Sequence, residues 1–122
     1  MSYEYLDNLF RQAKEDYPVS PALLDKFEKL DEYMIEHFKL AFGNRILKQL
    51  ESFIPVYVAC GGSEVDGFDF IFTNKILKKF ESLNIAFLKD ALKDLSIQLD
   101  KLFGKGNFPM AHAYIEGLIN NN

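Results

Sequence analysis

The 122-residue sequence has no tryptophan, a single cysteine (Cys60) and only two histidines, His37 and His112. One cysteine cannot form an internal disulfide, so nothing points to an oxidising compartment. These three side chains form neither a C-x-x-C nor an H-x3-H pair, and no zinc site is predicted. We expect Cys60 to be a small packed residue, because free cysteine is usually buried and its preceding neighbours are apolar.

Long hydrophobic runs and a basic, apolar leader are also missing. The longest apolar run, FIPVYVAC at residues 53–60, is far shorter than the roughly 18–20 residues of a membrane span. The first residues, MSYEYLDNLF, are acidic and aromatic, which is not typical of a signal peptide. The net charge of −4 gives no support for a nucleic-acid surface. We therefore expect a cytoplasmic protein that neither enters a membrane nor binds nucleic acid directly.

Apolar and aromatic side chains at helical spacing are abundant. Hydrophobic residues make up 48% of the chain, including twelve Phe, so a core filled largely by aromatic rings is expected. The spacing predicts an all-α fold, a compact bundle of five or six helices in a single domain covering residues 1–122. The predicted helices cover about residues 2–16, 21–42, 44–60, 68–80, 85–103 and 114–119. The fourth has its start at 63–66, and the last follows a Phe-Pro turn.

Local signals set several helix boundaries. Ser20 followed by Pro21 predicts an N-cap and a first helical position. Gly43 is expected to end the second helix, whose apolar side reaches Ala41. Pro55 is expected to kink the third helix, and a short strand at residues 56–58 is the competing interpretation, because Val, Tyr and Val favour strands.

The stretch VACGGSEVDGFDF, residues 58–70, raises the question of a ligand-binding loop. Its acids do not have the alternating positions of a calcium loop. Gly61 and Gly62 are expected to end one helix, and the Ser63 hydroxyl to cap the next. These three residues are predicted to form a hinge that fixes the angle between the two helices. Alanine at both glycines is expected to lower stability without loss of a bound ion.

No catalytic constellation is recognisable in the sequence. Gly104-Lys105-Gly106 lacks the Walker A string G-x-x-x-x-G-K-[ST], and a helix-ending turn is the expected role. Asp90 and Asp94 lie one helical turn apart with lysines interleaved, a pattern typical of a solvated face. We do not expect the chain to be an enzyme by itself, or to hold a metal or cofactor.

Three short motifs follow one another along the chain. They are Phe42-Gly43-Asn44-Arg45, the segment FDFIFTNKILKKF at 68–80 with its Asp69 and Lys75, and Phe108-Pro109-Met110-Ala111. Together they span about residues 23–119 and resemble the C-terminal helical lid subdomain of an AAA+ ATPase, in the branch of McrB-like restriction-system NTPases. Three positions depart from the family pattern: Phe72 replaces an aliphatic residue, Lys78 a proline, and Ala111 stands where serine is common.

The resemblance implies a role for Arg45 as the sensor-2 residue, whose guanidinium contacts the nucleotide phosphates in the family. It assigns Phe42, Gly43, Asp69 and Lys75 to the structural part of the motifs. ATP or GTP with Mg would be held by a Walker-bearing core, because this sequence has no Walker A or Walker B segment. The implied partners are that core, neighbouring ring subunits and a partner nuclease subunit. We expect the chain to be a lid fragment.

A second hypothesis from the same residues is a stand-alone helical module for protein–protein interaction. The aromatic excess and the missing catalytic groups motivate it, because an exposed apolar groove is a common docking surface. A smooth charged surface without an exposed apolar patch would count against it.

Overall fold

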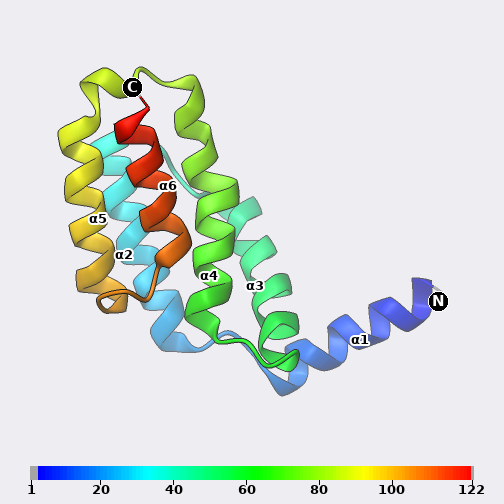
Figure 1. Cartoon of the computed structure of the whole chain (residues 1–122). Helices are drawn as coiled ribbons and strands as arrows, with labels where there is room; N and C mark the ends of the chain where they lie inside the picture. Colours follow the sequence, from blue (N-terminus) through cyan, green and yellow to red (C-terminus); the bar gives the residue numbers. More distant parts are fainter. Residues whose placement is uncertain (1–2, 122) are drawn as a thin grey trace.

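The computed structural model describes residues 3–121, which form six α-helices and three short π or 3₁₀ segments (Figure 1). The α-helices are α1 (Tyr3–Asp16), α2 (Pro21–Phe38), α3 (Gly43–Ala59), α4 (Glu64–Ile71), α5 (Lys89–Phe103) and α6 (Pro109–Asn120). The predicted all-α bundle is confirmed. No strand occurs within this range, so the strand interpretation of residues 56–58 is wrong. None of the described helices has both the length and the apolar character needed to cross a membrane.

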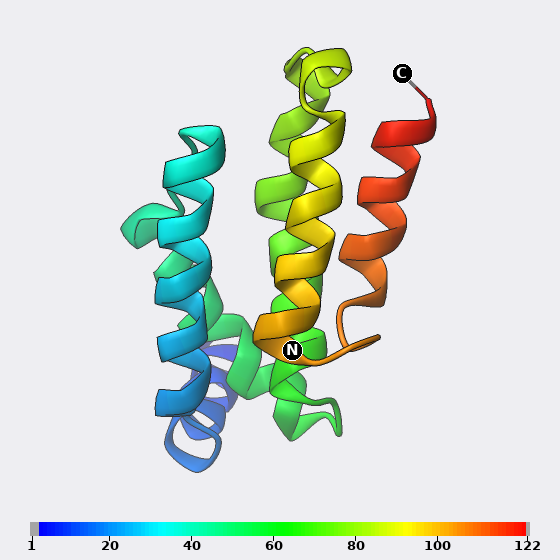
Figure 2. The same cartoon turned by 90° about the vertical axis from the view of Figure 1, so that its left-hand side faces the viewer.

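The helices α2, α4, α5 and α6 run side by side, as the two views in Figures 1 and 2 show. Helix α6 contacts both α4 and α5, α2 contacts α5, and α3 packs against α4. Helix α1 packs on α3 and extends away from the other helices, so its N-terminal end lies far from the bundle (Figure 1).

The predicted start of α2 is confirmed, but its predicted end is wrong. The Ser20 Oγ accepts a hydrogen bond from the Leu23 N–H at 3.1 Å, with Pro21 in the first turn. The helix ends at Phe38 because Lys39 adopts the left-handed conformation (φ 58°) and donates its N–H to the Ile35 carbonyl. Ala41 is therefore exposed in a loop, and Gly43 (φ 75°) begins α3 instead of ending α2.

The aromatic core is built around Phe68 of α4, which is 2% exposed. Its ring centroid lies 5.4 Å from that of Phe103, 5.7 Å from Phe108 and 5.9 Å from Phe27. Phe103 and Phe108 stack on each other at 4.3 Å. Such ring pairs contribute roughly 0.5–1.5 kcal/mol each beyond area burial. The expectation of an aromatic core is confirmed for phenylalanine, whereas the buried residues described include no tyrosine.

The predicted fourth helix is interrupted after Ile71. It continues as the π-helical segment η1 (Phe72–Ile76), then as the 3₁₀ segment η2 (Leu77–Ser82); a further 3₁₀ turn, η3 (Ile85–Phe87), precedes α5. A π-helical turn inserts an extra residue and rotates the following side chains around the axis. Leu77 and Phe80, which follow the insertion, are both fully buried. The interruption thus keeps the apolar face of this helix on the core.

The turn between α3 and α4 has the predicted chemistry, with one correction. Gly61 has a positive φ of 98°, and the Ser63 Oγ accepts the Asp66 N–H at 3.1 Å. Gly62 lies against the Tyr57 ring, which an added Cβ would meet at 2.1 Å. Cys60, expected to be packed, is exposed; it is the residue directly after the end of α3.

Alanine substitution of these glycines tests the turn. Gly61→Ala is expected to cost about 1–2 kcal/mol of unfolding free energy, because an L-residue is strained in the left-handed region. Gly62→Ala forces the Tyr57 ring to move and is expected to cost a similar amount, about 1–3 kcal/mol.

The matched control is Gly117→Ala in α6, where an added Cβ meets nothing within 4 Å. It is expected to be neutral or to stabilise by up to about 1 kcal/mol, because alanine favours helix. Chemical denaturation of the three variants measures these values. Equal effects at all three positions would contradict the role given to the turn.

Candidate functional site

Four consecutive residues of α4, Gly67 to Phe70, contact different parts of the molecule. Gly67 lies against α3, where an added Cβ would come within 2.7 Å of the Ile54 Cδ1. Phe68 occupies the centre of the aromatic core, and Phe70 stacks on Phe53 of α3 at 5.4 Å. Asp69 reaches α6. This segment therefore sets the positions of α3 and α6 relative to α4.

Asp69 accepts hydrogen bonds from two backbone amides at the start of α6. Its Oδ2 accepts the Met110 N–H at 2.9 Å, and its Oδ1 accepts the Ala111 N–H at 2.8 Å. Pro109 has no N–H, and the His112 N–H donates to the Phe108 carbonyl at 3.0 Å. The Met110 and Ala111 amides, which the helix cannot satisfy internally, thus both have an acceptor. Asp69 acts as an N-cap supplied from a residue 41 positions away.

The Asp69 carboxylate is 2% exposed, and this burial has an electrostatic consequence. Burial raises the pKa of Asp69 above its ordinary value, while the hydrogen bonds from the Met110 and Ala111 amides and the Thr73 hydroxyl oppose the rise. The Thr73 Oγ1 lies 3.4 Å from the Asp69 Oδ1. The carboxylate is held by three donors in a site that excludes solvent.

Two further polar contacts hold α6, and both were missed in the sequence. His112 Nε2 lies 2.9 Å from Asp100 Oδ1 of α5. The Tyr114 hydroxyl donates to Glu81 of η2, and burial together with this carboxylate raises the pKa of Tyr114 to about 12. The sequence did not indicate the His112–Asp100 pair, because Asp100 lies on a different helix.

The three motifs behind the lid resemblance come together in the fold. The Phe42 ring is 5.9 Å from Phe72, and Phe72 is 6.2 Å from Phe108. Asp69 joins the second motif to the third through its two amide bonds. The Phe42 N–H donates to Asp31 Oδ1 at 2.8 Å, a contact that the sequence did not indicate. Phe42 and Asp69 are therefore buried structural residues, whereas Gly43 opens α3.

Arg45 lies in the first turn of α3 and is exposed. Among residues 3–121 no hydrogen bond or ion pair to its guanidinium occurs, so the group faces solvent. A depression of about 330 Å³ beside this end of α3 is lined in part by Glu28, Asp31 and Glu51. These acids repel phosphate, so this depression is not an anion site. Any phosphate contact of Arg45 must come from outside the described part of the chain.

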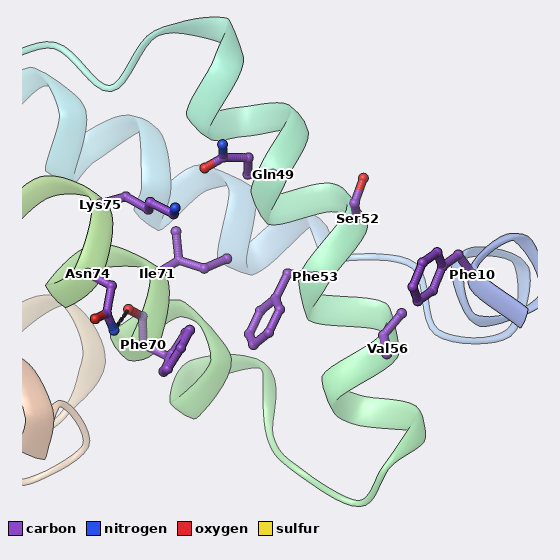
Figure 3. A pocket seen from close by; sticks show the side chains of 9 residues that line it. All are labelled: Phe10, Gln49, Ser52, Phe53, Val56, Phe70, Ile71, Asn74 and Lys75. Carbon is purple, nitrogen blue, oxygen red and sulfur yellow. Dashed lines mark hydrogen bonds between the residues drawn. The ribbon is translucent and has the colours of Figure 1, made fainter. Parts of the chain in front are cut away.

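Lys75, in η1, is exposed and lies at the edge of an apolar groove (Figure 3). The groove has a volume of about 530 Å³ and lies between α1, α3 and the α4–η1 helix. Its lining consists of Phe10, Gln49, Ser52, Phe53, Val56, Phe70, Ile71, Asn74 and Lys75. This groove was not predicted from the sequence. Phe70 is 43% exposed.

Other residues considered in the sequence form no site in the structure. Gly104 (φ 95°) follows the end of α5 and its N–H donates to the Asp100 carbonyl, so the predicted helix-ending role is confirmed. Across the described range, no group of three or more His, Cys, Asp or Glu side chains is placed to hold a metal ion. His37 is exposed and lies against the Tyr33 ring at 4.2 Å.

A scan against protein-family models, a search of curated proteins and a search of solved structures each return no match to this chain.

Substitution of Asp69 tests its role as the cap of α6. Asp69→Ala leaves the Met110 and Ala111 amides without an acceptor and is expected to cost about 2–3 kcal/mol of unfolding free energy. Asp69→Asn retains one acceptor oxygen and is expected to cost about half as much. Asp66→Ala is the matched control: this exposed acid in the first turn of α4 is expected to contribute about 0.5 kcal/mol or less. Equal losses for Asp69→Ala and Asp66→Ala in urea denaturation would contradict the capping role.

The pH dependence of stability provides a separate prediction. Because burial raises the pKa of Asp69 from the ordinary value of 3.8, the folded protein binds this proton more tightly than the unfolded chain. The stability contributed by the protonated group is present below the unfolded pKa and is lost as pH rises through the folded pKa. Asp69→Asn lacks this titration. The loss of unfolding free energy of this variant relative to the wild type is therefore expected to be larger at pH 4 than at pH 7. A larger destabilisation at pH 7 would mean that the amide bonds outweigh burial.

Proposed function

We propose that this chain is the helical lid of a McrB-like AAA+ nucleoside triphosphatase, and that it couples the nucleotide state to the packing of subunits. The observation that carries the proposal is the arrangement of Arg45. It is a solvent-facing arginine without an internal partner, on the first turn of a helix whose start is anchored in the core. The lid performs no catalysis by itself.

The anchoring of α3 supports a sensor role for Arg45. Phe42 is 4% exposed, its ring lies 5.0 Å from Phe27, and its N–H is bonded to Asp31 of α2. The backbone of Arg45 therefore has a defined position relative to the rest of the lid. Arginine suits the task, because its planar fork binds phosphate oxygens in pairs and stays charged at all relevant pH values.

The mechanism follows from rigid-body movement. When a nucleotide with a γ-phosphate occupies a neighbouring core, Arg45 would bind the phosphate and hold the lid in one orientation. Loss of the γ-phosphate would remove this contact and release the lid. ATP or GTP, with Mg, would be bound by the core and not by this chain. The neighbouring ring subunits and a nuclease subunit are the proposed partners of the assembly.

A second candidate function is a stand-alone helical module for protein–protein interaction. The apolar groove of about 530 Å³ favours it, because Phe10 and Phe70 remain about half exposed at its walls. Exposed apolar patches of this kind mark interaction sites in soluble proteins. Unlike the lid proposal, this function requires no nucleotide and no role for Arg45.

Nucleotide hydrolysis by the complete protein distinguishes the two. The lid proposal expects the reading frame around this chain, or an obligate partner, to supply a Walker A motif. In that assembly Arg45→Ala is expected to lower kcat at least about tenfold, equivalent to about 1.4 kcal/mol of transition-state stabilisation. The matched control is Lys48→Ala, which removes an exposed cation one turn further along α3 and is expected to leave kcat unchanged.

Unchanged melting temperatures would show that both variants retain the fold. Hydrolysis by Arg45→Ala at the wild-type rate would contradict the lid proposal, as would the absence of any Walker-bearing partner. An assembly that depends on the groove but not on Arg45 would favour the interaction module.

A further inference from the structure

Helix α1 keeps most of its apolar side chains outside the core. It packs on α3 and extends beyond the bundle (Figure 1). Leu6 and Phe10 of α1 are 39% and 49% exposed, Tyr17, the residue directly after the helix, is 45% exposed, and Ala13 is buried. A monomer therefore leaves a row of large apolar side chains in water on a helix with few other contacts. Such a row is typical of an interaction surface.

The spacing of this row matches a helix-pairing seam. Leu6, Phe10, Ala13 and Tyr17 follow each other at intervals of four, three and four residues, which are the a and d positions of a heptad pattern. We call Leu6, Phe10 and Tyr17 the α1 stripe. Ala13, in the middle of the row, is already buried within its own chain, so Leu6, Phe10 and Tyr17 are the members left for another helix. One copy of α1 uses only part of this face against its own α3.

The α1 stripe is continuous with the apolar groove. Phe10 belongs to both: it lines the groove together with Val56, Phe53 and Phe70 (Figure 3). A helix laid along the stripe would therefore also cover the adjacent groove. The stripe and the groove form a single apolar surface.

The charged residues beside the α1 stripe can pair with the same residues of a second copy. Asp7 and Lys14 are seven residues apart, so they lie on the same flank of the helix, two turns from each other. When two identical helices pair antiparallel, the same flanks face each other, and each Asp7 meets the other copy's Lys14. When the two helices pair in parallel, the flank that carries Asp7 and Lys14 faces the other flank of the second helix. Lys14 then meets Leu9, and no charge pair forms. The charge pattern favours the antiparallel arrangement.

We propose that this surface binds a second copy of the chain. Two copies pair their α1 helices antiparallel about a two-fold axis, so that each α1 covers the groove of the other, with Asp7 opposite Lys14 at two equivalent positions. The surface lies on α1 and its groove and does not involve Arg45, so this inference stands or falls independently of the lid proposal. Helix α1 has 14 residues, about 21 Å in length, and an interface of this size gives a reversible, concentration-dependent dimer.

Sedimentation of the full chain across a concentration series tests the interface. The wild type is expected to shift from monomer to dimer as concentration rises. Phe10→Asp places a charge in the stripe and is expected to raise the dimer Kd at least about tenfold. The matched control is Phe87→Asp in η3, at the end of the bundle opposite α1 (Figure 1). Phe87 is 85% exposed, and its substitution is expected to leave Kd unchanged.

Charge reversal tests the antiparallel arrangement. Asp7→Lys and Lys14→Asp are each expected to weaken self-association, because like charges then face each other across the pair. An equimolar mixture of the two variants is expected to regain dimers, since each substituted flank then meets its opposite charge. Asp7→Asn controls for loss of the Asp7–Arg11 pair within α1 and is expected to have a much smaller effect than Asp7→Lys.

Three results would overturn the proposal. The first is a chain that stays monomeric up to about 1 mM, a concentration far above the Kd of a specific interface. The second is a dimer that responds equally to Phe10→Asp and Phe87→Asp. The third is a mixture of Asp7→Lys and Lys14→Asp that dimerises no better than either variant alone. Circular dichroism of each variant shows whether the helices are intact.

Discussion

The fold depends on one buried contact, in which the Asp69 carboxylate accepts the amides of Met110 and Ala111. A buried carboxylate is costly unless donors surround it, and unpaired helix amides are costly in the same way. Here each satisfies the other. Because Asp69 lies beside Phe68, the centre of the aromatic core, the contact fixes the start of α6 relative to the core as well as to α4.

The four-residue segment that contains Asp69, Gly67 to Phe70, also positions α3. Gly67 allows close packing of α4 on α3, and the turn at Gly61 and Gly62 joins the two helices. Phe42 then ties the start of α3 to α2 and to η1 through ring contacts. Arg45 stands on this anchored start and faces outward. A side chain placed on so rigid a base can report on a neighbouring phosphate, which is the basis of the proposed lid function.

Local rules were sufficient for the fold class, for the N-caps at Ser20 and Ser63, and for the helix through Pro55, because these depend on neighbouring residues. They were insufficient where contacts join distant segments. Helix α2 ends at Phe38, where Lys39 is left-handed, and the Phe42 that follows is buried with its N–H bonded to Asp31. Cys60 lies just after the end of α3 and is exposed. The sequence marked Asp69 and residues 108–111 separately, but only the tertiary structure shows that they bind each other. The sensor role of Arg45 stays a prediction.

Hydrogen exchange at the start of α6 tests the central contact most directly. Amides in the first turn of a helix usually exchange quickly, because they have no partner within the helix. If the Asp69 carboxylate binds them as described, the Met110 and Ala111 amides will exchange as slowly as those of the buried core residues, and Asp69→Ala will remove this protection. Rapid exchange of both amides in the wild-type chain would contradict the account.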